Sequence, residues 1–389
     1  MTFKSFISLL LILCLSACVG QRESLPEEVL ASVQVPDFKS SLIRVWGDAR
    51  VSEVDPDEIR KTPPLKITID PKTGKKRQDF LVLSGGGAKG AYGAGLLNGW
   101  TEAGNRPQFS IVTGVSTGAI IAPFAFMGPR YDAFLTEFYT TYSTKDLVRP
   151  IGLGGLLGGS SVADSGPLEK LIAKYVTPQF LREVAAEYET GRYLLVGTTN
   201  LDAQRPVIWN MGEIARRGDA KALRLFRQVI LASISIPGAF PPVLIDVEAA
   251  GEKGQELHVD GGTTDNAVLL PAHLSIDEIE NRNVKLERRL FVVINSNLAP
   301  KREVIRASTI KIATRSIDTL IKQQTAGDAL RLYTYAQNNR IEFNYAEIPD
   351  DFDLKPDELF DPVYMRALYD VGKQNGQTGQ FWRDVPRGL

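Results

Sequence analysis

The sequence predicts an α/β fold with a mostly parallel central sheet. Short, continuously apolar segments alternate with longer segments of helical composition, and glycines mark several junctions between them. Apolar runs without polar alternation are typical of strands that are buried on both faces, as in a parallel sheet. The chain has 389 residues, of which 43% are hydrophobic and 23% charged, so it can bury a large core.

The individual elements follow from this alternation. The first buried strand is expected at residues 80–83, and the Ala- and Leu-rich stretch 91–103 is expected to form a helix. Further strands are expected at 109–112, 193–198, 257–259 and 290–294. Further helices are expected at 119–127, 221–233 and 308–337. The pattern predicts one domain over residues 79–345, and a tail at 346–389 that packs on it through a helix near 362–374.

The first residues resemble the signal peptide of a bacterial lipoprotein. Lys4 precedes an apolar run at 6–15, which is about half the length that a membrane-spanning helix needs. The run ends in Leu15-Ser16-Ala17-Cys18, which resembles the lipobox of that family. The resemblance implies a signal peptide at 1–17 and a lipid anchor on Cys18, whose several acyl chains would bind a membrane stably. A plain secretory signal that is cut nearby is the alternative.

The segment that follows the lipobox carries two further indications. Cys14 and Cys18 are the two cysteines of the chain, so loss of the signal would leave one, and no disulfide would form within the mature chain. Val19 stands where enteric lipoproteins retained in the inner membrane have Asp, which favours the outer membrane, facing the periplasm. Residues 18–78 are polar and rich in proline, and we expect a tether with local structure such as a short helix at 41–48.

Charge excludes one class of partner. The chain has 45 Lys and Arg against 46 Asp and Glu, a net charge of −1. No global positive field therefore favours nucleic acid, and no basic stripe with interleaved aromatic residues is present in the sequence. We expect no nucleic-acid partner.

A glycine-rich loop, Gly85-Gly86-Gly87-Ala88-Lys89-Gly90, follows the first predicted strand and opens a helix. Glycines let backbone N–H groups approach an anion, which the helix N-terminus also favours. The spacing matches a dinucleotide-binding fingerprint, but the next predicted strand ends without the acidic residue that such a site needs. A P-loop would need Ser or Thr after Lys89. The other interpretation is an oxyanion hole made by the amides of residues 85–88.

A second motif, Gly114-Val115-Ser116-Thr117-Gly118, favours the oxyanion hole over the dinucleotide site. It fits Gly-x-Ser-x-Gly and lies between a predicted strand and an apolar helix, which is the context of a nucleophile elbow. In that context Gly114 and Gly118 allow a strained turn that exposes the Ser116 hydroxyl. The alternative role of Ser116 is that of a helix N-cap.

The candidate base is Asp260, which ends a predicted strand in the sequence Asp260-Gly261-Gly262. Parallel α/β folds collect their sites at the carboxyl ends of strands, so an aspartate there can accept the Ser116 proton directly. The alternative is that Asp-Gly is a simple turn. A Ser-acid-His triad would require a late histidine, and the chain has two histidines. His258 precedes Asp260, and His273 follows it in the triad order but only thirteen residues on.

Together these motifs resemble the signature blocks of patatin-like phospholipases. The resemblance also includes Ala232-Ser233-Ile234-Ser235-Ile236-Pro237, the Phe240-Pro241-Pro242 segment and Asp265-Asn266, and it covers about residues 79–297. It implies a three-layer α/β/α fold, a Ser116–Asp260 dyad, and activity on acyl esters of phospholipids or related lipids. It also implies that neither a metal nor an organic cofactor is needed.

The substrate side is less defined by sequence. Residues 151–159 are apolar and glycine-rich, as in a lid or membrane-dipping loop, and equally as in a shielded surface loop. Lys89 can favour a phosphate headgroup or be a solvated side chain. A related esterase, thioesterase or acyltransferase remains an alternative activity, as does a catalytically silent lipid-binding protein of the cell envelope.

Overall fold

The computed structural model describes residues 22, 24–38, 40–53, 55–151, 161–271, 276 and 286–388. The signal peptide, the lipobox with Cys18, His273 and most of the candidate lid at 151–159 lie outside the described residues. The lipid anchor, the envelope location and the lid therefore stay predictions.

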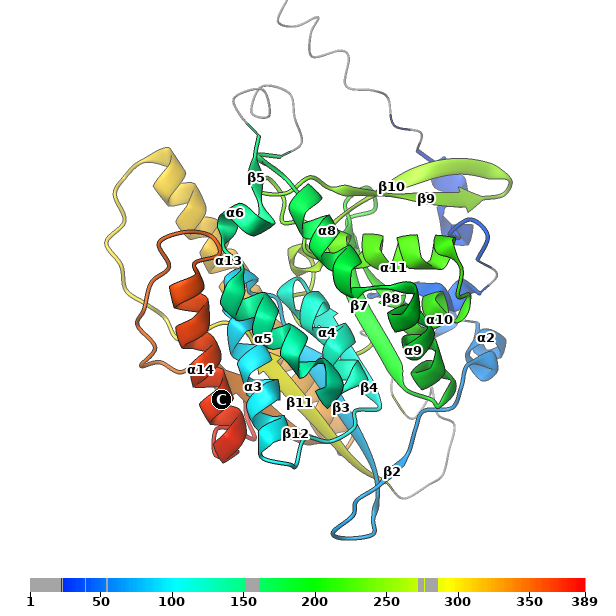
Figure 1. Cartoon of the computed structure of the whole chain (residues 1–389). Helices are drawn as coiled ribbons and strands as arrows, with labels where there is room; N and C mark the ends of the chain where they lie inside the picture. The colour runs from blue at the N-terminus through cyan, green and yellow to red at the C-terminus, as the bar shows by residue number, and fades with distance from the viewer. Residues whose placement is uncertain are drawn as a thin grey trace, which may run out of the picture.

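A ten-stranded sheet forms the centre of the molecule (Figure 1). Five strands, in the order β7-β4-β3-β11-β12, pair in parallel, and the remaining strands add antiparallel pairs at the margins. The strands of this sheet are β1 (Arg44–Trp46), β2 (Thr68–Ile69), β3 (Lys76–Leu83), β4 (Ile111–Val115), β7 (Tyr193–Asn200), β8 (Arg205–Asn210), β9 (Val243–Ala249), β10 (Glu252–Asp260), β11 (Glu287–Ile294) and β12 (Glu342–Glu347).

Helices cover both faces of the sheet. The α-helices are α2 (Pro56–Lys61), α3 (Gly90–Glu102), α4 (Thr117–Met127), α5 (Asp132–Thr141), α6 (Thr144–Leu147), α8 (Gly166–Tyr175), α9 (Pro178–Glu189), α10 (Met211–Arg216), α11 (Ala220–Ser233), α13 (Thr309–Asn338) and α14 (Pro362–Thr378). A separate two-stranded ribbon is formed by β5 (Arg149–Pro150) and β6 (Ala163–Asp164), the described segments on either side of the candidate lid. Short 3-10 turns are at Glu27–Ser32, Ser41–Ile43, Val51–Glu53, Gly87–Lys89, Pro129–Tyr131 and Gly261–Thr263.

Side-chain alternation along the central strands creates two cores. Leu81 and Leu83 of β3 face the core under α3, α4, α5 and α11, whereas Phe80 and Val82 face the core under α13. Successive side chains of a strand point to opposite faces, so the fully apolar run that predicted a buried strand supplies both cores. The predicted three-layer α/β/α fold with a mostly parallel central sheet is confirmed.

The N-terminal extension contributes to the sheet. The helix that we expected at 41–48 is a single 3-10 turn at Ser41–Ile43 followed by β1, which pairs antiparallel with β8. Strand β2 pairs with the first residues of β3, which itself begins at Lys76 rather than at residue 79. The local composition of this segment is polar, and its β structure depends on pairing with strands that are distant in sequence.

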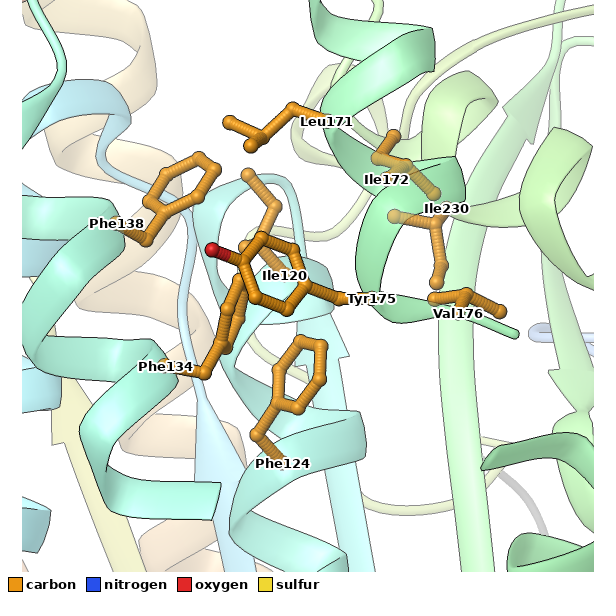
Figure 2. A pocket seen from close by; sticks show the side chains of 9 residues that line it. All are labelled: Ile120, Phe124, Phe134, Phe138, Leu171, Ile172, Tyr175, Val176 and Ile230. Atoms are coloured by element: carbon orange, nitrogen blue, oxygen red, sulfur yellow. The ribbon is translucent and has the colours of Figure 1, made fainter. Parts of the chain in front are cut away.

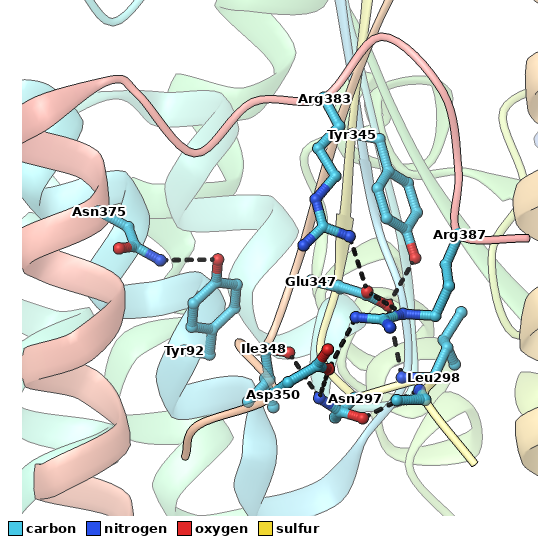
Figure 3. A network of polar contacts seen from close by, with 11 residues as sticks. Tyr92, Asn297, Leu298, Tyr345, Glu347, Ile348, Asp350, Asn375, Arg383 and Arg387 are labelled. Atoms are coloured by element: carbon cyan, nitrogen blue, oxygen red, sulfur yellow. Dashed lines mark hydrogen bonds and ion pairs between the residues drawn. The ribbon is translucent and has the colours of Figure 1, made fainter.

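The tail packs on the domain through α14 and the residues after it. Figure 3 shows the Glu347 carboxylate at the end of β12 between Arg383 and Arg387, at 3.2 and 2.6 Å, with the Tyr345 hydroxyl donating to the same group. The Tyr92 hydroxyl of α3 accepts a hydrogen bond from Asn375 of α14. The predicted helix near 362–374 is therefore present, and its contacts tie the tail to the sheet and to α3.

Candidate active site

The glycine-rich loop connects β3 to α3 at the carboxyl edge of the sheet. Because β3 and β4 are parallel neighbours, with Leu83 opposite Gly114, the loop and the Ser116 turn leave the sheet side by side. A Cβ atom at Gly85 would lie 3.0 Å from the Ser116 Cβ atom, so glycine is needed for this approach. The sequence-predicted loop and Ser116 are thus brought together.

Ser116 lies in a strained turn between β4 and α4. Its backbone has φ 55° and ψ −126°, an uncommon conformation for a residue with a side chain, and its side chain makes no capping hydrogen bond. A Cβ atom at Gly114 would lie 2.2 Å from the Gly118 carbonyl oxygen, which explains the first glycine of the motif. The geometry is that of a nucleophile elbow, and it does not fit a capping role for Ser116.

The turn that contains Ser116 is fixed by a hydrogen bond to Ser233. The Ser116 amide donates to the Ser233 hydroxyl at 3.0 Å, and that hydroxyl donates to the Gly197 carbonyl of β7 at 2.6 Å. Ser233 is fully buried at the end of α11. Sequence reasoning noted Ser233 as part of a resemblance and missed this role, because the bond depends on helix α11 returning to the sheet.

Asp260 ends β10 and is buried together with Ser116; the two residues are 5% and 6% exposed. Its Oδ1 atom accepts a hydrogen bond from the Gly262 amide at 2.7 Å, whereas Oδ2 has no hydrogen-bond partner among the described residues. Burial raises the pKa of Asp260 to about 7, opposed by the Ser116 hydroxyl and the Gly262 amide, which favour the ionised form. The carboxyl group therefore changes charge near neutral pH, beside a strained serine.

The amides of the glycine loop differ in their availability. The Gly85 amide donates to the Asn266 carbonyl at 3.1 Å, so it is not free to bind an oxyanion. Within the described ranges, the amides of Gly86, Gly87 and Ala88 make no hydrogen bond. Gly87 has φ +58°, and the space where its side chain would be is open. Three of the four expected donors thus remain available to an anion.

Two asparagines that sequence reasoning did not assign to the site support this loop. Asn295, which follows β11, donates through Nδ2 to the Ser84 carbonyl at 2.8 Å and accepts from the Gly93 amide at 3.1 Å. Asn266 contacts Gly85 and donates to Thr325 of α13 at 2.6 Å. Their spacing in the sequence gives no signal, since the loop, β11 and α13 meet only in the folded chain.

Asp328 of α13 fixes the Asp265–Asn266 turn. Its carboxylate accepts from the amides of Asn266 and Ala267 at 2.6 and 3.1 Å and pairs with Arg331. Burial raises the pKa of Asp328 to about 6, although Arg331 opposes the shift. The middle of α13 is therefore bonded to the turn whose Asn266 contacts the glycine loop.

His258 makes its hydrogen bonds to residues other than Ser116 and Asp260. Its Nδ1 atom lies 3.0 Å from the Thr198 hydroxyl, and its Nε2 atom 3.0 Å from Glu256, which also pairs with the buried Arg44. Burial lowers the pKa of His258, so the ring is favoured in its neutral form. It is a fully buried, packed residue of β10.

An apolar cavity lies one helical turn beyond the nucleophile (Figure 2). Ile120 of α4, four residues after Ser116, lines it together with aromatic side chains of α5 and α8, among them Phe138 and Tyr175. The free volume is about 10 Å³, room for roughly one water-sized sphere. An acyl chain would enter this space only if the lining side chains moved.

Two further properties concern membranes and metals. Among the described residues, no helix combines the length and the apolar composition that crossing a bilayer requires. The described ranges also contain no group of three or more His, Cys, Asp or Glu side chains placed to hold a metal ion.

Comparisons with known proteins show which family the central part of the chain resembles. The structure of VipD from Legionella pneumophila is similar at 14% identity and a TM-score of 0.35, over 83% of this chain and 71% of that chain. A structure of full-length SpcU with full-length ExoU from the type III secretion system of Pseudomonas aeruginosa is similar at 15% identity and a TM-score of 0.29. The match covers 83% of this chain and 54% of that chain. No curated protein matches the chain. Residues 81–273, a range that contains Ser116 and Asp260, match the model of the patatin-like phospholipases, so this part of the chain is similar to that family.

Proposed function

We propose that the protein is a lipid acyl hydrolase of phospholipase A or lysophospholipase type, with Ser116 as nucleophile and Asp260 as its base. The observation that carries the proposal is the pairing of a strained, buried serine with a buried carboxyl group whose pKa is raised to about 7. A base with a pKa near the working pH is the effective choice for proton transfer. The family match supports a lipid ester as the substrate.

The first half of the reaction forms an acyl-enzyme. Asp260 takes the proton of the Ser116 hydroxyl as the serine oxygen attacks the ester carbonyl carbon. The free amides of Gly86, Gly87 and Ala88 stabilise the resulting oxyanion, and each such donor can contribute about 3 kcal/mol. The tetrahedral intermediate then collapses, the bond to the alcohol breaks, and Asp260 returns its proton to the leaving oxygen.

The second half releases the fatty acid. Asp260, again ionised, takes a proton from water while the water oxygen attacks the acyl carbon. The second tetrahedral intermediate uses the same amides, and its collapse breaks the ester to Ser116. The serine oxygen recovers the proton from Asp260, so the enzyme returns to its starting state and one water is consumed.

Variants of the two residues test the proposal. We expect Ser116→Ala and Asp260→Asn each to lower kcat for a fluorogenic acyl ester by at least about a thousandfold. The nucleophile and its base act as one unit, so the loss of either residue removes most of the contribution of both. Ser165→Ala removes an equally buried hydroxyl elsewhere, and Asp246→Asn an exposed carboxylate on β9, and both are expected to retain activity. Wild-type rates in the Ser116 and Asp260 variants would refute the assignment.

The same variants address the alternatives. Lipid mass spectrometry after incubation with a membrane extract identifies which acyl esters disappear in the wild type and persist with Ser116→Ala. A new ester formed with an added alcohol would indicate acyl transfer. The absence of any Ser116-dependent change would indicate a silent lipid-binding protein.

A further inference from the structure

Helix α13 is longer than the sheet it packs against. Its 30 residues span about 45 Å at 1.5 Å per residue, whereas the eight residues of β11 span about 26 Å. The chain leaves β11 at the carboxyl edge and α13 returns to the start of β12, so the excess length projects beyond the carboxyl edge. Figure 1 shows this outer half (yellow) extending past the neighbouring helices. The projection is therefore at the edge that carries Ser116.

The outer half of α13 presents an apolar stripe to solvent. Ala313, Ile317, Leu320 and Ile321 follow the i, i+4, i+7, i+8 spacing of one helical face, and Leu320 is 70% exposed. The opposite face is polar, with Lys311, Arg315, Asp318 and Lys322 at matching spacing. That polar face is continuous with the face of the inner half that packs on the domain at Thr325 and Ala329. The apolar stripe consequently points away from the molecule.

The segment 301–322, which includes this outer half, is strongly cationic. It holds six Lys and Arg against two acidic residues, a net charge of +4 in a chain whose total is −1. Among the described residues, Arg302, Arg306 and Lys311 form no ion pair and are exposed. Val304 in the same segment is 89% exposed. An exposed apolar stripe on a helix whose polar face and preceding residues carry unpaired cations is complementary to an anionic lipid surface.

The outer half also lies beside the site. The Lys322 ammonium donates to the Ala299 carbonyl. Burial lowers the pKa of Lys322, and the positive charge of Lys89 in the glycine loop lowers it further. One turn further on, Thr325 bonds to Asn266, which contacts Gly85. A surface that held this helix would therefore lie next to the glycine loop.

We propose that the 301–322 segment docks on an anionic phospholipid bilayer, with the stripe of Ala313, Ile317, Leu320 and Ile321 in the acyl–headgroup boundary. The basic side chains contact lipid phosphates, and the docking holds the carboxyl edge of the sheet at the membrane surface. The purpose of the surface rests on the proposed lipid hydrolysis, whereas the docking itself can be measured without turnover.

A single environment-sensitive label tests the contact directly. The full chain with Cys14→Ser, Cys18→Ser and Ser116→Ala receives a cysteine by Leu320→Cys, which is coupled to a nitrobenzoxadiazole fluorophore. The matched control is Ile69→Cys on β2, which is 67% exposed and pairs with the start of β3, at the opposite edge of the sheet. Both proteins share the same N-terminal segment, so any membrane affinity of that segment acts on both.

The probe membranes are phosphatidylcholine vesicles with and without phosphatidylglycerol. We expect the label at residue 320 to shift to the blue and to be quenched by acyl-chain nitroxide lipids, with the label at residue 69 unaffected. The double change Arg306→Glu with Lys311→Glu is expected to weaken binding to the anionic vesicles by at least about tenfold. High salt is expected to weaken it as well.

Three results would overturn the proposal. They are an unresponsive label at residue 320, an equal response at residue 69, and a blue shift without vesicles that grows with protein concentration. The last of these would assign the stripe to a second copy of the chain. Because the test protein lacks the Ser116 hydroxyl, a failure here leaves the hydrolysis assays of the proposed function untouched.

Discussion

Ser116 and Asp260 both occupy positions that oppose folding stability. Backbone conformations outside the common regions carry a strain of about 1–3 kcal/mol, and Ser116 is held in one of them by the Ser233 bond and by close packing around Gly114. Asp260 is a carboxyl group in a nearly water-free position with one unpaired oxygen. Such groups persist where a function depends on them, and their effect on stability is measurable.

Asp260 predicts a characteristic dependence of stability on pH. Its pKa in the folded chain, about 7, exceeds the value of about 3.9 expected when unfolded, so between these values the native state holds a proton that the unfolded chain has lost. Stability therefore falls as pH rises through this window. We expect the difference in unfolding free energy between Asp260→Asn and wild type to grow in favour of the variant by about 2–3 kcal/mol as pH rises from 5 to 8, measured by urea unfolding. A gap that does not change with pH would contradict the shift.

Residue-level prediction from the sequence depends on local signals. The positions of Ser116 and Asp260 follow from short motifs at strand ends, and the structure brings the two residues together. The roles of Ser233, Asn295 and Asp328 were not predictable, because each side chain bonds to a backbone group 60 or more residues away. The sequence could not show that the Gly85 amide is bonded while the next three amides are free, because that difference depends on the position of Asn266.

At the scale of elements, the sequence identified strands that are buried on both faces and missed most of those at the margins. Strand β12 has the polar sequence Glu-Phe-Asn-Tyr-Ala-Glu, and β9 alternates buried and exposed residues, so neither has the apolar run of a central strand. Strands β1 and β8 pair with each other at one margin of the sheet. Their formation depends on the neighbouring strand more than on local composition.

The contact between α3 and α14 gives a second prediction. A Cβ atom at Gly372 would lie 2.1 Å from the Tyr92 carbonyl oxygen, and one at Gly376 would lie 2.1 Å from the Leu96 carbonyl oxygen, so the two backbones touch. We expect Gly372→Ala to lower the free energy of unfolding by about 1–3 kcal/mol, as overpacking does. Thermal and urea unfolding measure this loss.

Gly327 provides the matched control for that substitution. It lies within α13, and no atom is within 4 Å of its Cβ position. Alanine has the higher helix propensity, so Gly327→Ala is expected to leave stability unchanged or to raise it by up to about 1 kcal/mol. Equal effects of the two substitutions would argue against backbone contact between α3 and α14.

At the scale of the whole molecule, the N-terminal extension pairs with the strand that ends in the candidate base. Arg44 of β1 pairs with Glu256 of β10, four residues before Asp260, and both side chains are buried. Burial alone would raise the Glu256 pKa, but His258 and Arg44 together lower it to about 2. The segment whose sequence suggested a tether therefore supplies a charge to the strand that ends in the candidate base.

Removal of that charge is expected to destabilise the whole domain. Arg44→Ala would leave the Glu256 carboxylate buried with one partner fewer, and we expect a loss of about 3–5 kcal/mol in unfolding free energy. The control is Arg205→Ala, which breaks a half-exposed pair with Asp48 of the same segment and is expected to change stability by about 1 kcal/mol or less. Losses of similar size in both variants would show that the buried pair has no special weight.

In the proposed reaction, Ser116 forms the acyl-enzyme. The most direct measurement is peptide mass spectrometry of the protein after treatment with a fluorophosphonate, which reacts with an activated serine. We expect one adduct, on the peptide that contains Ser116, with labelling abolished by Ser116→Ala and strongly slowed by Asp260→Asn. An unmodified Ser116 in protein that hydrolyses acyl esters, or an adduct on another serine that accounts for the activity, would contradict this role of Ser116.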